Sequence, residues 1–353
     1  MTKTVCCGNV KIGGGNPISI QSMTNVSSHD HRALVDQISK LEDAGCDIVR
    51  VAVPDMEAVS ELYKLKSVFE IPIVADIHFD YRLAIESIKA GADKIRINPG
   101  NIGSAQKIEK IIKEASNAKV PIRIGVNSGS LEKEIVRKYG GVTAEGLAES
   151  AVKNAHLFES MGFKDIVLSI KSSDVKITFD AYKIVSGKLN YPLHIGVTEA
   201  GTPKRGIIKS SVGIGALLLS GIGDTLRVSL TGDPVEEVRV AKEILSATGI
   251  RKNNLEMVSC PTCGRTGIDL EDLANSVEDR LSKYEFSKPV KIAVMGCVVN
   301  GPGEAKEADY GVAGGEKRGI IFEKGEIVEK VPEAELLDEF IKHILSDDRV
   351  IKR

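Results

Sequence analysis

The sequence contains no apolar run long enough to span a bilayer, and it has little net charge. Its 353 residues carry 47 Lys and Arg against 49 Asp and Glu, a formal net charge of −2. This balance gives no reason to expect nucleic acid or an anionic membrane as a partner. The opening stretch MTKTVCCGNVKIGGGNP lacks the apolar core of a signal peptide. We therefore expect a cytoplasmic protein with no membrane partner.

Cysteine is also scarce, with six residues in the chain. In a cytoplasmic protein, metal binding or buried thiols are favoured over disulfides. Cys6, Cys7 and Cys46 have no ligand-like neighbours in the sequence, so we interpret them as small apolar fillers. The glycines of IGGGNP lack the Lys-Ser/Thr that completes a phosphate-binding loop, and they indicate a turn.

Short apolar runs alternate with amphipathic stretches over the first two thirds of the chain. Each run is rich in Val, Ile and Leu and ends in Gly, Pro, Asn, Asp or Ser, as strands leaving a sheet do. The eight runs occupy residues 17–25, 47–55, 71–80, 94–101, 121–130, 165–173, 192–201 and 224–233. Between them, segments such as 31–45, 81–92 and 143–162 place apolar residues at helical spacing. The pattern predicts an α/β fold, with a (β/α)8 TIM-type barrel over residues 1–248; an open doubly wound sheet is the alternative.

Charged and polar residues recur at the predicted carboxyl ends of these strands, where barrel enzymes place their chemistry. The cations alternate with aliphatic residues, as Arg96 does between Ile95 and Ile97, so they share the parity of inward-facing positions. The strand-end residues are Gln21, Arg50, Asp76, His78, Arg96, Asn98, Arg123, Asn127, Lys171, His194, Glu199, Arg227 and Ser229. Several arginines meeting at one end favour a compact anion such as a diphosphate. Ion pairing within the barrel is the alternative for each of them.

The remaining residues, 257–353, predict a small α/β domain with a hairpin turning at Lys324-Gly325. Cys260 and Cys263 form a Cys-x-x-Cys pair, and Cys297 ends an apolar strand before a Gly/Pro loop. Three thiols are one ligand short of a four-cysteine cluster site, and Glu304 in that loop is a candidate for the fourth. A structural zinc site and a redox dithiol are alternatives. Against zinc, the only histidine of this domain, His343, lies in a charged terminal helix.

Taken together, these motifs resemble the 4-hydroxy-3-methylbut-2-en-1-yl diphosphate synthase family of the methylerythritol phosphate route to isoprenoids. The resemblance covers nearly the whole chain and takes the two-domain bacterial form. The matching segments are QSMTN, VRVAVPD, ADIHFDYR, KIRINPGNIG, RIGVNSGSLE, HIGVTEAGT, KSSVGIGALL, DTLRVSLTGDP, CPTCGR and MGCVVNGPGEA. It implies reductive ring opening and dehydration of 2-C-methyl-D-erythritol 2,4-cyclodiphosphate, with electrons from a ferredoxin or flavodoxin.

The resemblance also implies a role for individual residues. A 4Fe–4S cluster would be held by Cys260, Cys263, Cys297 and Glu304, and Glu199 would donate a proton. Substrate contacts would come from Arg50, His78, Arg96, Asn98, Arg123, Asn127, Lys171, Arg227 and Ser229. The linker at residues 246–256 is short for the second domain to fold back over its own barrel mouth, and the family is homodimeric, so we expect an active site shared between two chains. The loop at residues 26–33 departs from the family pattern, and the Cys6-Cys7 pair has no counterpart in its function.

Two other functions are compatible with parts of this pattern. A pterin-binding transferase of the dihydropteroate synthase type, with an appended zinc domain, would share the anion-binding arginines. A non-catalytic iron–sulfur sensor or carrier would use the barrel as a scaffold and would leave the polar strand ends without a role. The transferase would lack the visible absorption of a cluster, which an iron–sulfur enzyme shows. The sensor or carrier would have the cluster but would bind no substrate at the strand ends.

Overall fold

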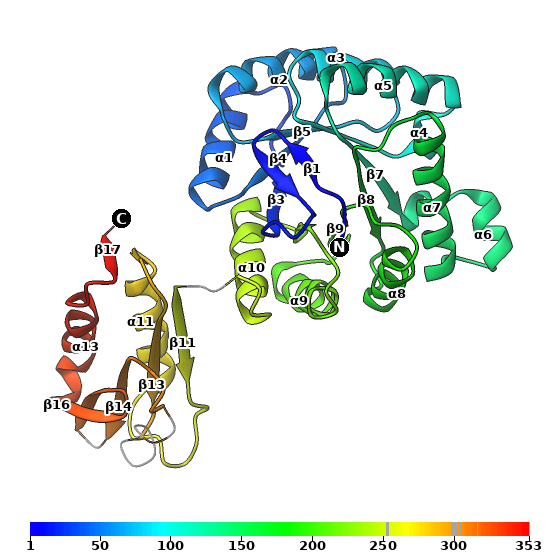
Figure 1. Ribbon diagram of the computed structural model, residues 1–353. Helices are drawn as coiled ribbons and strands as arrows, with labels where there is room; N and C mark the ends of the chain where they lie inside the picture. The colour runs from blue at the N-terminus through cyan, green and yellow to red at the C-terminus, as the bar shows by residue number, and fades with distance from the viewer. Residues whose placement is uncertain (252–253, 298–302, 304, 316, 353) are drawn as a thin grey trace. The chain divides into compact units, whose positions relative to one another are not determined.

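The computed structural model describes residues 1–251, 254–297, 303, 305–315 and 317–352. The chain divides into two compact units, Met1–Arg251 and Lys252–Arg353 (Figure 1). None of the helices among the described residues is long and apolar enough to cross a membrane. Each unit has hydrophobic clusters of its own, and each is described separately below.

The first unit contains a ring of eight parallel strands, which confirms the predicted barrel. The strands are β3 (Ser19–Met23), β4 (Ile48–Ala52), β5 (Ile73–Asp76), β6 (Lys94–Ile97), β7 (Ile122–Asn127), β8 (Ile166–Lys171), β9 (His194–Ile195) and β10 (Thr225–Leu226). Each strand pairs with its neighbours in chain order, and β10 pairs with β3. A parallel bridge between Leu168 and Leu193 joins β8 to the start of β9. This bridge closes the ring and excludes the open sheet.

Helices follow the strands and pack around the ring (Figure 1). They are α1 (His31–Asp43), α2 (Met56–Val68), α3 (Tyr81–Lys89), α4 (Pro99–Ile102), α5 (Ala105–Ala118), α6 (Lys133–Tyr139), α7 (Ala144–Ser160), α8 (Val175–Ser186), α9 (Pro203–Leu219) and α10 (Pro234–Ala247), with a 3₁₀ turn at Ser128–Ser130. Strand-end aspartates cap several of them: Asp30 accepts from the Ala33 N–H and Asp55 from the Ala58 N–H. Such caps stabilise a helix by about 1 kcal/mol each, and they mark where each strand-to-helix loop ends.

The core of this unit lies between the ring and its helices. Ile95, Ile97, Ile122 and Ile124 belong to it and are fully buried. Because side chains alternate along a strand, the residues between these isoleucines, Arg96 and Arg123, point into the ring. The predicted inward parity is therefore confirmed for Arg96 and Arg123.

A hairpin that the sequence did not reveal lies against one end of the ring. It consists of β1 (Val5–Cys7) and β2 (Val10–Ile12). Cys7 and Ile12 are fully buried and cluster with Ile48 and Val74, at the amino-terminal ends of β4 and β5 (Figure 1). Cys7 is thus an apolar filler as predicted, whereas Cys6 is exposed.

The second unit has a mixed sheet of five strands in the order β11-β13-β14-β15-β16. The strands are β11 (Leu255–Ser259), β13 (Val290–Met295), β14 (Tyr310–Gly315), β15 (Arg318–Glu323) and β16 (Glu326–Pro332); the helices are α11 (Leu270–Leu281) and α13 (Leu336–Leu345), with a 3₁₀ turn at Glu333–Glu335. β12 (Tyr284–Phe286) pairs with β17 (Val350–Lys352). Lys324 and Gly325 both have positive φ, 48° and 87°, as a tight hairpin turn between β15 and β16 requires.

Candidate active site

The carboxyl ends of the barrel strands form one opening, here called the barrel mouth, and its wall is strongly cationic. Five cationic side chains come from five different strands or strand ends: Arg50, Arg96, Arg123, Lys171 and Arg227. Arg123 is 1% exposed, Arg96 6% and Lys171 7%. Burying a cation destabilises the folded protein unless an anion or carboxylate pairs with it. The cations that lack a carboxylate partner are therefore the ones available to an anionic ligand.

Asp76 at the end of β5 is the carboxylate that meets two of the arginines. Its oxygens lie 3.2 Å from Arg96 Nη1 and 3.8 Å from Arg50 Nε, and its Oδ2 lies 3.3 Å from Nε2 of His78. Burial by itself would raise the pKa of Asp76, but the charge of Arg50 and the bond to His78 outweigh it and hold that pKa far below its ordinary value. Asp76 is therefore ionised, and it aligns Arg50, Arg96 and His78.

Arg123 and Lys171 are buried among like charges. Nε and Nη1 of Arg123 are buried and have no hydrogen-bond partner among the described residues. Burial, followed by repulsion from Arg50 and Arg96, lowers the pKa of Arg123. Burial and the nearby Arg123 and Arg227 lower the pKa of Lys171 well below its ordinary value. A polyanion in the mouth would reverse both effects, because it would supply acceptors and opposite charge.

Two asparagines stand beside these cations. With its amide oxygen turned toward Arg96, Asn127 accepts from Nη2 at 3.1 Å. Asn98 donates from Nδ2 to Ser130 Oγ at 2.8 Å and accepts from the Gly100 N–H at 3.1 Å. The Asn98 bonds hold the loop between β6 and α4 against the loop after β7.

The other predicted site residues lie in loops around the mouth. His78 is about half exposed, Ser229 is half-buried after β10, and Glu199 is exposed between β9 and α9. Glu199 has a φ of 51°, in the left-handed region that non-glycine residues adopt infrequently. Among the described residues, no hydrogen bond or ion pair joins Glu199 or Ser229 to the cations of the mouth. The structure thus gathers the strand residues and leaves these two in the surrounding loops.

Two residues of this region were not predicted from the sequence. Met23 ends β3 with its sulfur facing Arg50, whose Nε and Nη2 lie 3.0 and 2.8 Å away. Glu237 of α10 is 4% exposed and forms an ion pair with Arg227. A signal for Glu237 was present, because it occupies an apolar position of the α10 repeat, in line with Ala241 and Ile244.

In the second unit, two of the predicted cluster ligands follow strands that end at one edge of the sheet, and Cys263 lies in the loop after Cys260. β11 and β13 are parallel neighbours with Ser259 opposite Val294, so Cys260 and Cys297 follow strands that end at the same edge. Gly296 donates its N–H to Cys260 Sγ at 3.1 Å. Hydrogen bonds from Arg265 lower the pKa of the exposed Cys263, which favours the thiolate that iron or zinc requires.

The described residues do not complete a coordination sphere. No three His, Cys, Asp or Glu side chains among them are close enough together to hold one metal ion, and Glu304 lies outside the described residues. All three cysteines are free thiols. His343 pairs with Glu323 at 2.6 Å, so it is engaged elsewhere. The place and chemistry of the three thiols fit an iron–sulfur group.

Comparison with known proteins gives full-length relatives. Residues 2–242 match the family described as GcpE TIM-barrel domain, and residues 256–346 match GcpE protein C-terminal domain. Three curated relatives are each named 4-hydroxy-3-methylbut-2-en-1-yl diphosphate synthase (flavodoxin). They come from Caldanaerobacter subterraneus subsp. tengcongensis (59% identity, 98% of this chain, 96% of the relative), Clostridium acetobutylicum (57%, 97% and 98%) and Listeria monocytogenes (52%, 100% and 96%).

Among solved structures, dihydropteroate synthases resemble the chain more distantly. Those from Yersinia pestis and Coxiella burnetii are both 13% identical to it with a TM-score of 0.49, over 70% of this chain and 100% and 99% of theirs. A likeness at this level carries no conclusion about function. The relatives found by sequence are far closer, because more than half of all residues are identical over nearly the full length of the chain. The chain therefore belongs to the 4-hydroxy-3-methylbut-2-en-1-yl diphosphate synthase family.

Proposed function

We propose that this chain is itself an oxidoreductase with the activity in its relatives' name. It would open the ring of 2-C-methyl-D-erythritol 2,4-cyclodiphosphate and form 4-hydroxy-3-methylbut-2-enyl diphosphate, as two electrons and protons enter and water leaves. The names of the relatives support flavodoxin as the electron donor, and a ferredoxin is the alternative. One observation carries the proposal: a barrel mouth with five inward cations and buried guanidinium nitrogens that lack partners.

In this proposal the mouth residues bind and orient the diphosphate. Arg123, whose Nε and Nη1 lack partners among the described residues, and Lys171, surrounded by like charges, would meet the phosphates. Arg50 and Arg96, already aligned by Asp76, would contact the same group. Arg227, which shares the Met23 sulfur with Arg50, and Ser229 would contact it as well. Asn98, Asn127 and His78 would contact hydroxyl or phosphate oxygens. Holding the anion at several points fixes the reacting carbon, which is how positioning lowers a barrier.

We propose that Cys260, Cys263, Cys297 and Glu304 hold a 4Fe–4S cluster. The donor set supports this, since the free thiols Cys260 and Cys297 follow neighbouring strands, and Cys263, in the loop after Cys260, has a lowered pKa. A bound cluster would supply low-potential single electrons, which amino-acid side chains cannot deliver. The protein's part is to hold its thiolates through bonds such as Gly296 N–H to Cys260 Sγ.

We propose that Glu199 holds the proton that leaves with the hydroxyl group as water. Its exposed loop position and its lack of an ion-pair partner among the described residues support this, because a proton donor must be free to approach the substrate. The proposal also includes a homodimer in which each active site combines the barrel of one chain with the cluster domain of the other. The cytoplasmic location expected from the sequence stays a prediction.

Anaerobic purification provides the test of this function. The protein should show the broad visible absorption of a cluster, contain iron and acid-labile sulfide, and convert the cyclic diphosphate when reduced flavodoxin is supplied. Cys263→Ser should remove the absorption and the activity, whereas Cys6→Ser, an exposed thiol in β1, should leave both. Stoichiometric zinc without sulfide would contradict the proposal and favour the transferase alternative. A cluster without turnover of this substrate would favour the sensor or carrier.

A further inference from the structure

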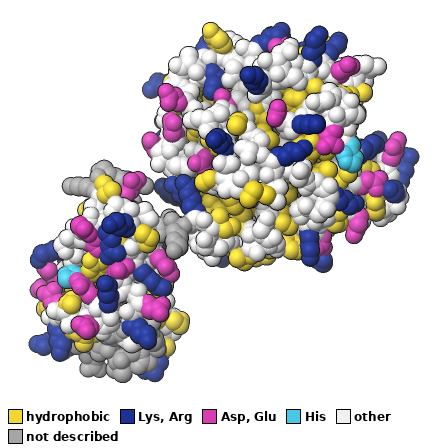
Figure 2. All heavy atoms as spheres, in the orientation of Figure 1, with side chains coloured by type: hydrophobic (Ala, Val, Ile, Leu, Met, Phe, Trp, Pro, Cys, Tyr) yellow, Lys and Arg dark blue, Asp and Glu magenta, His cyan; other side chains and the backbone are white. Residues whose placement is uncertain are grey.

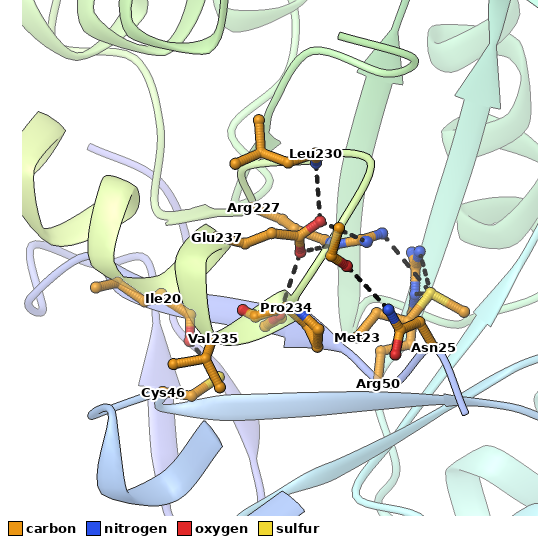
Figure 3. A network of polar contacts seen from close by, with 12 residues as sticks. Ile20, Met23, Asn25, Cys46, Arg50, Arg227, Leu230, Pro234, Val235 and Glu237 are labelled. Carbon is orange, nitrogen blue, oxygen red and sulfur yellow. Dashed lines mark hydrogen bonds and ion pairs between the residues drawn. The ribbon is translucent and has the colours of Figure 1, made fainter. Parts of the chain in front are cut away.

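Glu237 is a buried carboxylate at the outer side of the barrel mouth. It lies near the start of α10 and accepts four hydrogen bonds (Figure 3). Its Oε2 accepts from Arg227 Nε and from Ser22 Oγ, both at 3.2 Å. Its Oε1 accepts from the Leu230 N–H at 2.9 Å and from Arg227 Nη2 at 3.4 Å. One side chain thus connects α10, β3, the end of β10 and the loop that follows β10.

These bonds determine which part of Arg227 is left for a ligand. Glu237 occupies the Nε–Nη2 edge of the guanidinium, and Nη1 remains, 3.6 Å from the sulfur of Met23. The same sulfur accepts from Arg50 at 2.8 Å. Figure 3 shows Glu237, Arg227, Met23 and Arg50 in one continuous network. A neutral acceptor between two arginines keeps them adjacent without cancelling their charge, so the orientation imposed on Arg227 extends to Arg50.

We propose that Glu237 is a positioning residue for the anion site of the barrel mouth. It fixes Arg227 through the Nε–Nη2 edge of the guanidinium and leaves Nη1, beside the Met23 sulfur, for a ligand. This inference rests on the proposed function, in which the mouth binds a diphosphate. Glu237 does not touch the substrate and acts through Arg227.

The charge of Glu237 and its geometry have opposite effects on an anion. A carboxylate in the mouth repels a diphosphate, so if charge alone mattered, Glu237→Gln would strengthen binding. The amide of Gln would instead place N–H groups against either Arg227 or Leu230, which are themselves donors. If positioning dominates, the same substitution weakens binding because Arg227 loses its orientation. The sign of the change therefore separates the two roles.

The experiment measures the affinity of the intact protein for inorganic diphosphate by titration calorimetry. We expect Glu237→Gln to weaken binding by about tenfold, the effect of one charge-assisted hydrogen bond. The matched control is Glu236→Gln, which removes the same charge from the neighbouring residue, an exposed partner of Arg239. We expect that control to stay within about twofold of the unmodified protein. Thermal unfolding verifies that each variant is folded.

A double-mutant cycle tests whether Glu237 acts through Arg227. In an Arg227→Gln background, Glu237→Gln should have no further effect on affinity. An equal loss of affinity in both backgrounds would show that Glu237 has only a structural role. Tighter binding by the single variant Glu237→Gln would show that Glu237 affects affinity only through its charge. Either result overturns the inference. If Glu237→Gln does not fold, Ser22→Ala, which removes one of the four bonds, should give a smaller loss in the same direction, and an unchanged affinity overturns the inference. An unmodified protein that does not bind diphosphate counts against the proposed function as well.

Discussion

At the scale of single residues, Arg123 is a buried cation of the barrel without an ion-pair partner among the described residues. A guanidinium that is 1% exposed, with two nitrogens lacking partners among the described residues, is unfavourable for the folded chain by itself. Asp76 compensates Arg50 and Arg96 and Glu237 compensates Arg227, but neither forms an ion pair with Arg123. Its lowered pKa reflects the same burial and repulsion. This arrangement makes sense if a ligand completes it.

We therefore expect Arg123→Met to weaken diphosphate binding by about 1.5–3 kcal/mol, the value of a hydrogen bond to a charged group. Because Met fills similar space without a buried charge, thermal stability of the ligand-free protein should stay the same or rise. Calorimetry and thermal unfolding measure the two effects. Arg239→Met, on the exposed side of α10, is the control. Unchanged affinity would make Arg123 a structural residue of the barrel.

Glu199 makes the contrasting case, since it is exposed and its proposed role is in turnover. Glu199→Gln should retain the visible absorption and the substrate affinity and lose most of kcat, because the amide cannot release a proton. General acids contribute roughly 10²- to 10⁴-fold to rates. Glu145→Gln, an exposed residue of α7, should keep the full rate. A Glu199 variant with nearly unchanged kcat would remove this residue from the mechanism.

At the scale of elements, β6 and β7 show how closely the strands are fitted to the cations. A Cβ at Gly125 of β7 would lie 2.9 Å from Arg96 Nε and 3.0 Å from Nη2. The glycine therefore provides the space in which the guanidinium lies flat against the barrel wall. A methyl group there would push Arg96 away from Asp76 and Asn127, which now hold it.

We expect Gly125→Ala to weaken diphosphate binding by about tenfold, comparable to losing one charge-assisted bond. The matched control is Gly129→Ala in the following turn, where an added Cβ meets nothing within 4 Å. Titration of both variants with inorganic diphosphate makes the comparison. Equal affinities in the two variants would show that Arg96 is not held by this fit.

The same elements explain what the sequence could predict. Strand periodicity and the alternation around Arg96 predicted the barrel and its inward cations, because alternation along a strand is a local property. The β1–β2 hairpin could not be predicted, since three-residue strands carry almost no periodic signal. Met23 was overlooked because a thioether is an uncommon partner for arginine. The predicted linker at residues 246–256 ends in a strand, because β11 begins at Leu255.

At the scale of the whole molecule, the two units divide the proposed chemistry. The barrel unit holds the cationic mouth and the second unit holds the thiols, so the proposed function requires both in one site. Residues 248–254 connect α10 to β11. In a (β/α)8 barrel the helices run antiparallel to the strands, so α10 ends away from the mouth. A short connection from that end favours a cluster domain that serves the barrel of a partner chain.

Mixing inactive variants tests this arrangement. An Arg123 variant lacks a working mouth and a Cys297 variant lacks a working cluster. In a shared dimer, each mixed pair contains one site with both defects and one site with neither, so activity should partly return after subunit exchange. Mixing two Arg123 variants is the control. Exchanged mixtures that stay inactive would place the whole site within one chain.

The β1–β2 hairpin at the amino-terminal end of the barrel affects how substrate enters the proposed site and how product leaves it. Cys7 and Ile12 pack against Ile48 and Val74 at the amino-terminal ends of the strands, so the hairpin covers that end of the barrel, opposite the mouth. Substrate and product must then use the same opening, and neither can pass the other. Under the proposed function, accumulated product would block entry of substrate, so inhibition by product would be competitive. The rate of product release through the mouth would then limit turnover.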